Sequence, residues 1–168
     1  MHWRAYSARM RSVMMLHFYK MTGDSHDFVM LDNRDLSLSH ILTRANIADI
    51  CQRRSGVGAD GVIAVEPALG DADVRMRYYN ADGDETEMSP DAACCFTAFV
   101  DFLMESGMKE VRFETSTGTA EGTVNEDDSI TLRIDTPEET VHSGIALIVY
   151  CGQMILLCGD ECDCGCSE

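Results

Sequence analysis

The sequence predicts a single α+β domain, and three observations favour this fold class. First, 168 residues with 45% hydrophobic content suffice for one globular domain with a substantial core. Second, several short strand-like segments are interspersed with two helix-like segments. Third, the connections between them are long and look antiparallel, unlike the regular alternation of a parallel βαβ array.

Apolar and alternating segments predict the strands. The expected strands cover residues 16–20, 28–31, 62–65, 74–79, 110–115 and 129–134. Residues 74–79 alternate apolar and basic or polar side chains, which is the period-two pattern of a half-buried strand. A glycine-rich turn at 55–61 precedes the third strand, and turn-forming residues at 80–84 follow the fourth. A glycine-rich hairpin region is expected between the last two strands.

Two segments predict helices. Residues 44–53 bury apolar side chains at helical spacing, and Thr43 can cap the first turn. A second helix is expected from Pro90 to about Glu105, with apolar positions mostly three or four residues apart. Ser89 is in the N-cap position, and Pro90 is at the first helical position, where a missing N–H removes no intrahelical bond.

The charge excludes some function classes. The chain has 13 basic and 29 acidic residues and a net charge of −16, which would repel a phosphate backbone, so nucleic-acid binding is not expected. No apolar run approaches the ~18 residues needed to span a bilayer, so we expect no membrane partner and a cytoplasmic location. The excess acid is spread along the chain, as on an ordinary solvated surface.

The two ends of the chain differ from the middle. Residues 1–15 are expected to be a dispensable leader, since translation could begin at Met14 or Met15, although a transit peptide is possible on composition alone. Residues 138–168 are expected to be a divergent cysteine- and acid-rich tail with no clear period. Five of the eight cysteines lie there, at a spacing that fits a zinc site poorly. A degenerate or out-of-frame end is favoured over soft-metal binding, and no metal site is predicted.

Four motifs occur in order along residues 16–137. The strongest is NADGDETEM at 80–88, which runs directly into Ser89. The others are FYKMTGDSHDF at 18–28, RRSGVGADG at 53–61 and RMRYY at 75–79. Together they resemble the motifs of diaminopimelate epimerases. This resemblance implies an antiparallel sheet curled around a central helix, the one that starts after Ser89. It also implies interconversion of L,L- and meso-diaminopimelate in bacterial lysine and cell-wall synthesis.

The resemblance further implies a cofactor-independent mechanism. In this family two cysteines, one from each of two similar domains, face the α-carbon of the amino-acid substrate as thiolate base and thiol acid. A thiolate at a helix N-terminus is stabilised by the helix dipole. The first cysteine corresponds to Ser89, and the substrate-contacting positions correspond to His26, Asn80, Pro90 and Asp91. No cofactor is expected.

Only Asn80 among these positions matches the family pattern. Ser89 replaces the cysteine, and a hydroxyl ionises far less readily than a thiol. Pro90 replaces a glycine and has no N–H to offer a carboxylate. Asp91 replaces an asparagine and puts a negative charge where the family holds an anion, and His26 replaces another asparagine. We therefore expect negligible epimerase activity from this chain, which the motifs relate only to the N-terminal half of the family's enzymes.

Several alternatives remain open. Cys94, in place of the family's arginine, and Cys95 are candidates for a substitute thiol, but Cys95 is expected to pack in the core. Ser89 with His26 as base would be a hydrolytic pair, against the simpler interpretation of an N-cap serine and a loop histidine. The chain is otherwise a non-catalytic, ligand-binding homodimer or a truncated remnant without function. A proline racemase relative is a weaker option.

Overall fold

The computed structural model describes residues 13–105, 107, 109–135, 140–144 and 146–157. These residues form nine strands, two α-helices and a short 3-10 helix, η1 (Ser39–Ile41). The helices are α1 (Arg44–Cys51) and α2 (Pro90–Met104). The strands are β1 (Val13–Thr22), β2 (Asp27–Asp32), β3 (Gly61–Pro67), β4 (Val74–Asn80), β5 (Glu110–Glu114), β6 (Thr119–Val124), β7 (Ile130–Ile134), β8 (Thr140–Gly144) and β9 (Leu147–Leu157).

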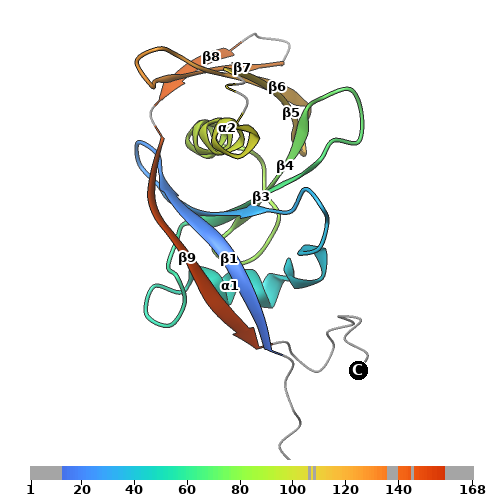
Figure 1. The fold of residues 1–168 in the computed structure, drawn as a ribbon, viewed down its shortest axis with the longest axis vertical. Coiled ribbons are helices and arrows are strands. Elements are labelled where there is room, and N and C mark those ends of the chain that lie inside the picture. Colours follow the sequence, from blue (N-terminus) through green and yellow to red (C-terminus); the bar gives the residue numbers. More distant parts are fainter. Residues whose placement is uncertain (1–12, 106, 108, 136–139, 145, 158–168) are drawn as a thin grey trace, which may run out of the picture.

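All nine strands belong to one sheet in the order β8-β7-β6-β5-β4-β3-β2-β1-β9. The sheet curls around α2, which is seen end-on in Figure 1, and α1 packs against the outer face of the sheet. The predicted α+β fold with a sheet around a central helix is therefore confirmed. The sheet is mostly antiparallel, but β2 pairs with β3 and β4 pairs with β5 in parallel.

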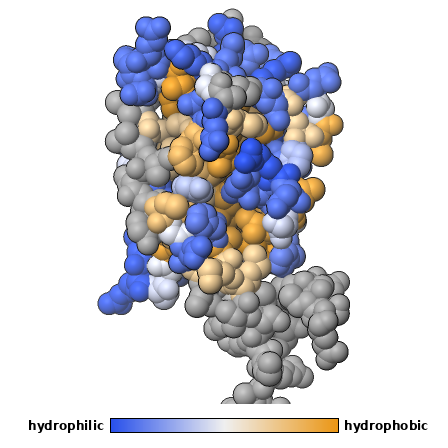
Figure 2. Space-filling model, viewed as in Figure 1, coloured by the Kyte–Doolittle hydropathy of each residue, from blue (hydrophilic) through white to orange (hydrophobic). Residues whose placement is uncertain are grey.

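The sheet separates two hydrophobic clusters. The inner cluster surrounds α2 and contains Phe96 and Phe99 of the helix with Phe28 and Phe113 of the sheet, all fully buried. The outer cluster lies under α1 and includes Ile47, Ile50 and Cys51. Apolar residues gather along the middle of the view in Figure 2, with charged and polar residues around them. Cys95 is fully buried in the inner cluster, as the sequence predicts.

Both helix starts follow the predicted capping. The Thr43 hydroxyl accepts a hydrogen bond from the backbone N–H of Asn46 at 3.3 Å, and the Ser89 hydroxyl accepts one from Ala92 at 3.2 Å. Helix α2 ends with Glu105 in the left-handed conformation (φ 48°), which terminates the helical hydrogen bonds. Within the described part of the chain, no helix is long and apolar enough to cross a membrane.

The sheet continues past residue 137, where the sequence suggests a divergent tail. Strand β8 pairs with β7, and β9 pairs with β1 from Val13↔Leu157 to Thr22↔Leu147. β1 correspondingly starts within the expected leader. The apolar run of β9 lacks a two-residue period, and its partner is more than 120 residues away in sequence, so no local pattern reports this pairing. Residues 1–12 and the tail cysteines from Cys158 onward lie outside the described residues.

The inner cluster generates a prediction about how closely α2 approaches the sheet. A Cβ added at Gly122 of β6 would collide with the side chain of Thr97 on α2. Gly122→Ala should therefore lower the free energy of unfolding by about 1–3 kcal/mol, measured by chemical denaturation. In a Thr97→Ala background, which removes the two nearest atoms, the same substitution should be clearly less destabilising. Equal losses in both backgrounds would contradict this close contact.

Candidate functional site

A cavity of about 270 Å³ lies at the N-terminus of α2. Its walls come from the loop between β1 and β2, the first two turns of α2 and the end of β8. The lining residues are Asp24, Ser25, His26, Ser89, Pro90, Asp91, Cys94 and Gly144. Four of the five predicted site residues, all except Asn80, are thus brought together around one cavity.

Ser89 and Pro90 set the start of the helix. Ser89 has extended backbone angles (φ −94°, ψ 155°), and its hydroxyl is engaged with the N–H of Ala92. Pro90 follows at the first helical position and brings no N–H to the cavity wall. A hydrogen bond with Ser89 also opposes the raised pKa that burial gives to the Tyr78 phenol. The serine hydroxyl is therefore part of the local structure of the helix start.

Asp91 binds the opposite wall. Its Oδ1 accepts from the backbone N–H of Asp24 at 2.7 Å, and its Oδ2 accepts from those of Ser25 at 3.2 Å and His26 at 2.8 Å. The His26 ring nitrogen Nδ1 lies 3.0 Å from the same Oδ2. The side chain of Asp91 is only 14% exposed. The ring of His26 thus pairs with Asp91. A hydrolytic pair would instead require it to contact the hydroxyl of Ser89.

Two thiols lie in the first turns of α2. Burial raises the pKa of Cys94 to about 11, and the carboxylates of Asp91 and Asp24 add to this shift. Burial raises the pKa of Cys95 further. Cys94 lines the cavity, a position that the sequence reasoning underrated because it lies more than one turn into the helix. Both thiols remain protonated at neutral pH.

Asn80 lies at the end of β4 and does not line this cavity. Its Oδ1 accepts from the backbone N–H groups of Asp82 at 3.0 Å and Asp84 at 3.2 Å. The turn also needs Gly83, whose φ is +88° and at which an added Cβ would collide with the Arg44 backbone. The Asn80 side chain therefore shapes the turn after β4, and the structure does not bring it to the other four residues.

Residues of two of the motifs form an ion network that the sequence analysis does not predict. Asp27 accepts from Arg53 at 2.8 Å and pairs with Lys20 at 2.9 Å, while Arg53 also reaches Asp60 at 3.2 Å. Lys20 in addition donates to the Gly58 carbonyl at 2.6 Å. The bond from Arg53 is the main reason that the pKa of Asp27 is held far below its usual range. These residues fix the base of the loop that carries His26. In the sequence, the opposite charges of these residues are the only indication of the network.

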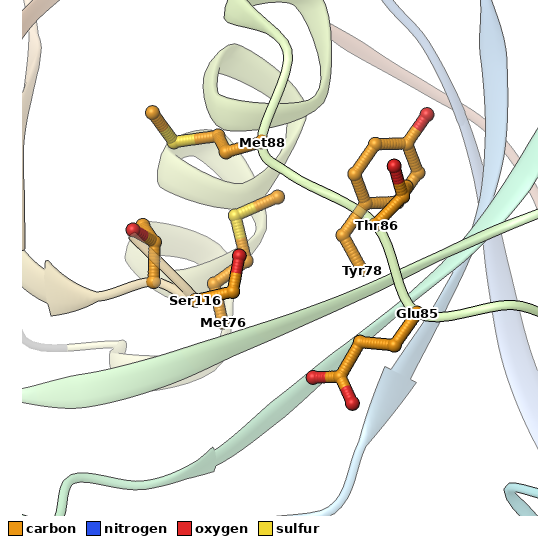
Figure 3. Close-up of a pocket in the computed structure, with 7 residues that line it drawn as sticks. Met76, Tyr78, Glu85, Thr86, Met88 and Ser116 are labelled. Carbon is orange, nitrogen blue, oxygen red and sulfur yellow. The ribbon is translucent and has the colours of Figure 1, made fainter. Parts of the chain in front are cut away.

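A second, narrow crevice lies beside β4 (Figure 3). Its lining residues are Met76, Tyr78, Glu85, Thr86, Met88, Thr115 and Ser116. Figure 3 shows Tyr78 next to Thr86, whereas Glu85 points away from the crevice. Glu85 instead accepts from Arg77 at 2.6 Å. The crevice has no room for a ligand, and within the described residues no group of three or more side chains could hold a metal ion.

Comparison with known proteins gives a consistent family match. The model of the diaminopimelate epimerase family matches residues 18–140. A putative chloroplastic diaminopimelate epimerase of Oryza sativa subsp. indica is 36% identical over 134 residues, covering 79% of this chain and 37% of that protein. A diaminopimelate epimerase of Cyanothece sp. is 37% identical over 127 residues, covering 74% of this chain and 45% of that protein. The chain thus spans less than half the length of these relatives.

Solved structures show the same fold at low sequence identity. A methylitaconate-delta-isomerase superposes with a TM-score of 0.59 at 13% identity, covering 86% of this chain and 97% of that one. A hydroxyproline epimerase from Agrobacterium vitis superposes with a TM-score of 0.53 at 18% identity, covering 74% and 43%. At these identities the likeness concerns the fold alone.

The ion network predicts a pH dependence of stability. The folded-state pKa of Asp27 lies below its ordinary value of 3.8, so its stabilisation is fully present above that value and is lost as the pH falls toward the folded-state pKa. Asp27→Asn should lower the free energy of unfolding at pH 7 by about 2 kcal/mol. It should also remove part of the loss of stability that we expect for the wild type below about pH 4.

The measurement is urea denaturation between pH 2.5 and pH 7. Asp49→Asn, at an exposed position of α1, is the control with the same change in charge. If both variants lose stability equally at pH 7, the network has no special role in holding the loop.

Proposed function

The chain belongs to the diaminopimelate epimerase family, and we propose that its cavity receives a small amino-acid ligand without exchanging the α-proton of diaminopimelate. One observation carries this proposal. The residue at the family's cysteine position is Ser89, its hydroxyl caps α2 through Ala92, and the thiol of the cavity, Cys94, is protonated at neutral pH.

The reaction depends on the base that removes the α-proton. Removing a weakly acidic α-proton needs a base whose pKa is near the working pH. Burial raises the pKa of Cys94 well above the working pH, so its thiol is not such a base at pH 7. A serine hydroxyl ionises even less readily and needs a separate activating base. The imidazole of His26, which lines the cavity, is engaged with Asp91.

The surroundings of Ser89 also disfavour a carbanion. Proton abstraction next to a carboxylate builds negative charge, which active sites stabilise with N–H donors. Pro90 offers no N–H, and the carboxylates of Asp24 and Asp91 both line the cavity. These two charges raise the free energy of any anion formed there. The start of α2 therefore lacks both an activated base at Ser89 and an N–H donor at Pro90.

We keep a cytoplasmic location as part of the proposal. It rests on the composition of the chain. The Oryza relative, by contrast, is named chloroplastic. Imaging of the full chain fused to a fluorescent protein at its C-terminus would decide between the two compartments.

The proposal predicts that the purified chain does not exchange the α-proton. L,L-diaminopimelate is incubated with the protein in deuterated water, and the α-proton signal is followed by NMR. The expected rate is that of the sample without protein. Exchange at enzyme-like rates would overturn the proposal, and its disappearance in Cys94→Ser would then identify Cys94 as the base.

A further inference from the structure

We propose that the consecutive backbone amides of Asp24, Ser25 and His26 form a carboxylate-binding site, and that Asp91 fills this site as an intramolecular ligand. The inference deepens the proposed function and rests on it in one respect, namely that the same cavity receives an amino-acid ligand. The loop would hold the carboxylate of that ligand, and only when Asp91 is displaced.

The donors converge on both oxygens of one carboxylate. Three successive N–H groups reach Asp91 at 2.7 to 3.2 Å, and the His26 ring adds a fourth contact at 3.0 Å. Successive N–H groups that point into one concavity are a recurring anion-binding arrangement in proteins. Hydrogen bonds to an ionised oxygen are shorter and stronger than neutral ones. The geometry is therefore that of an occupied anion site.

The loop is shaped for close approach of a carboxylate. Gly23 closes the turn by donating its N–H to the His26 carbonyl at 2.9 Å. A Cβ at Gly23 would collide with Oδ1 of Asp91, so only glycine lets the carboxylate come this near. Below the loop, the Lys20–Asp27–Arg53 network holds its base in place. The turn at Gly23 and the ion network thus help to position the donors through contacts that do not involve Asp91.

There is room for a free ligand beside this site. The cavity of about 270 Å³ continues from Asp91 toward Ser89, Cys94 and Gly144. A small carboxylate ligand could therefore place its carboxylate on the loop and the rest of its atoms in the cavity. It would have to displace Asp91, which is tethered next to the donors at a high effective concentration. Millimolar free carboxylate competes poorly against such a neighbour.

Removing the tethered carboxylate should open the site. In Asp91→Ala, sodium formate is the probe, because it is the smallest carboxylate and needs no further contacts. The full chain is labelled with ¹⁵N, and the amide signals of Asp24, Ser25 and His26 are followed during titration, with sodium chloride at equal ionic strength as reference. We expect saturable shifts confined to this loop, with an apparent affinity at least about tenfold above that of the wild type.

Asp127→Ala is the matched control. It removes the same charge from a carboxylate that also accepts a backbone N–H, that of Ser129 in the turn before β7. It should respond to formate like the wild type, so an equal response in both variants would reduce the effect to net charge and overturn the inference. A folded Asp91→Ala protein without saturable loop shifts would overturn it as well.

A second variant covers the case in which Asp91→Ala does not fold. Asp91→Asn keeps the size of the side chain and removes its charge, so formate should displace it more readily than it displaces the native carboxylate. A formate response no stronger than that of the wild type would contradict the inference. Proton exchange on L,L-diaminopimelate is read separately. The appearance of exchange would overturn the proposed function, whereas the carboxylate-binding site would still be judged by the formate titration.

Discussion

The enclosure of α2 by the curled sheet is the constraint on which the rest of the structure depends. Because the helix is buried along most of its circumference, small side chains or glycines must face it where strands come close. Gly122 leaves space for Thr97, and Gly144 lies against Cys94, where an added Cβ would be 2.8 Å from the sulfur. A helix packed this tightly cannot rotate or slide without disrupting the inner cluster. The position of its first turn is therefore set by the core.

Because the core holds α2 in place, the position of the cavity walls does not depend on which side chains line the cavity. The core fixes where residues 89–91 project, and the network around Asp27 and Arg53 fixes the loop opposite. Side-chain identity at the first turn then decides what the cavity can do. Substitutions at Ser89, Pro90 and Asp91 change the available base, N–H donor and charge while leaving helix α2 in place. A chain can in this way keep the family's fold with an altered site.

Local sequence patterns predicted those parts of the structure that depend on neighbouring residues. Ser89 and Pro90 marked the start of α2, and alternation marked β4, because capping and pleating act over a few residues. The β9–β1 pairing could not be predicted in this way, since it joins the two ends of the chain. At the site, the negative charge of Asp91 was foreseen, but its partners are backbone amides, which leave no side-chain signal. The family resemblance implies that Asn80 contacts the substrate. In the structure its side chain accepts hydrogen bonds within the turn after β4.

Asp91 links stability and ligand binding through the same donors. The three loop amides belong to exposed residues, where water would replace a lost acceptor, so each hydrogen bond to Asp91 stabilises the loop by only about 1 kcal/mol net. The aspartate supplies this stabilisation permanently, whereas an asparagine would supply it only in part and a ligand carboxylate only when bound. An interaction that stabilises Asp91 in this site, without changing the donors themselves, therefore lowers the apparent affinity for a free carboxylate, because both compete for the same hydrogen bonds. Asp91 therefore stabilises the loop and at the same time lowers the affinity of the loop for a free carboxylate.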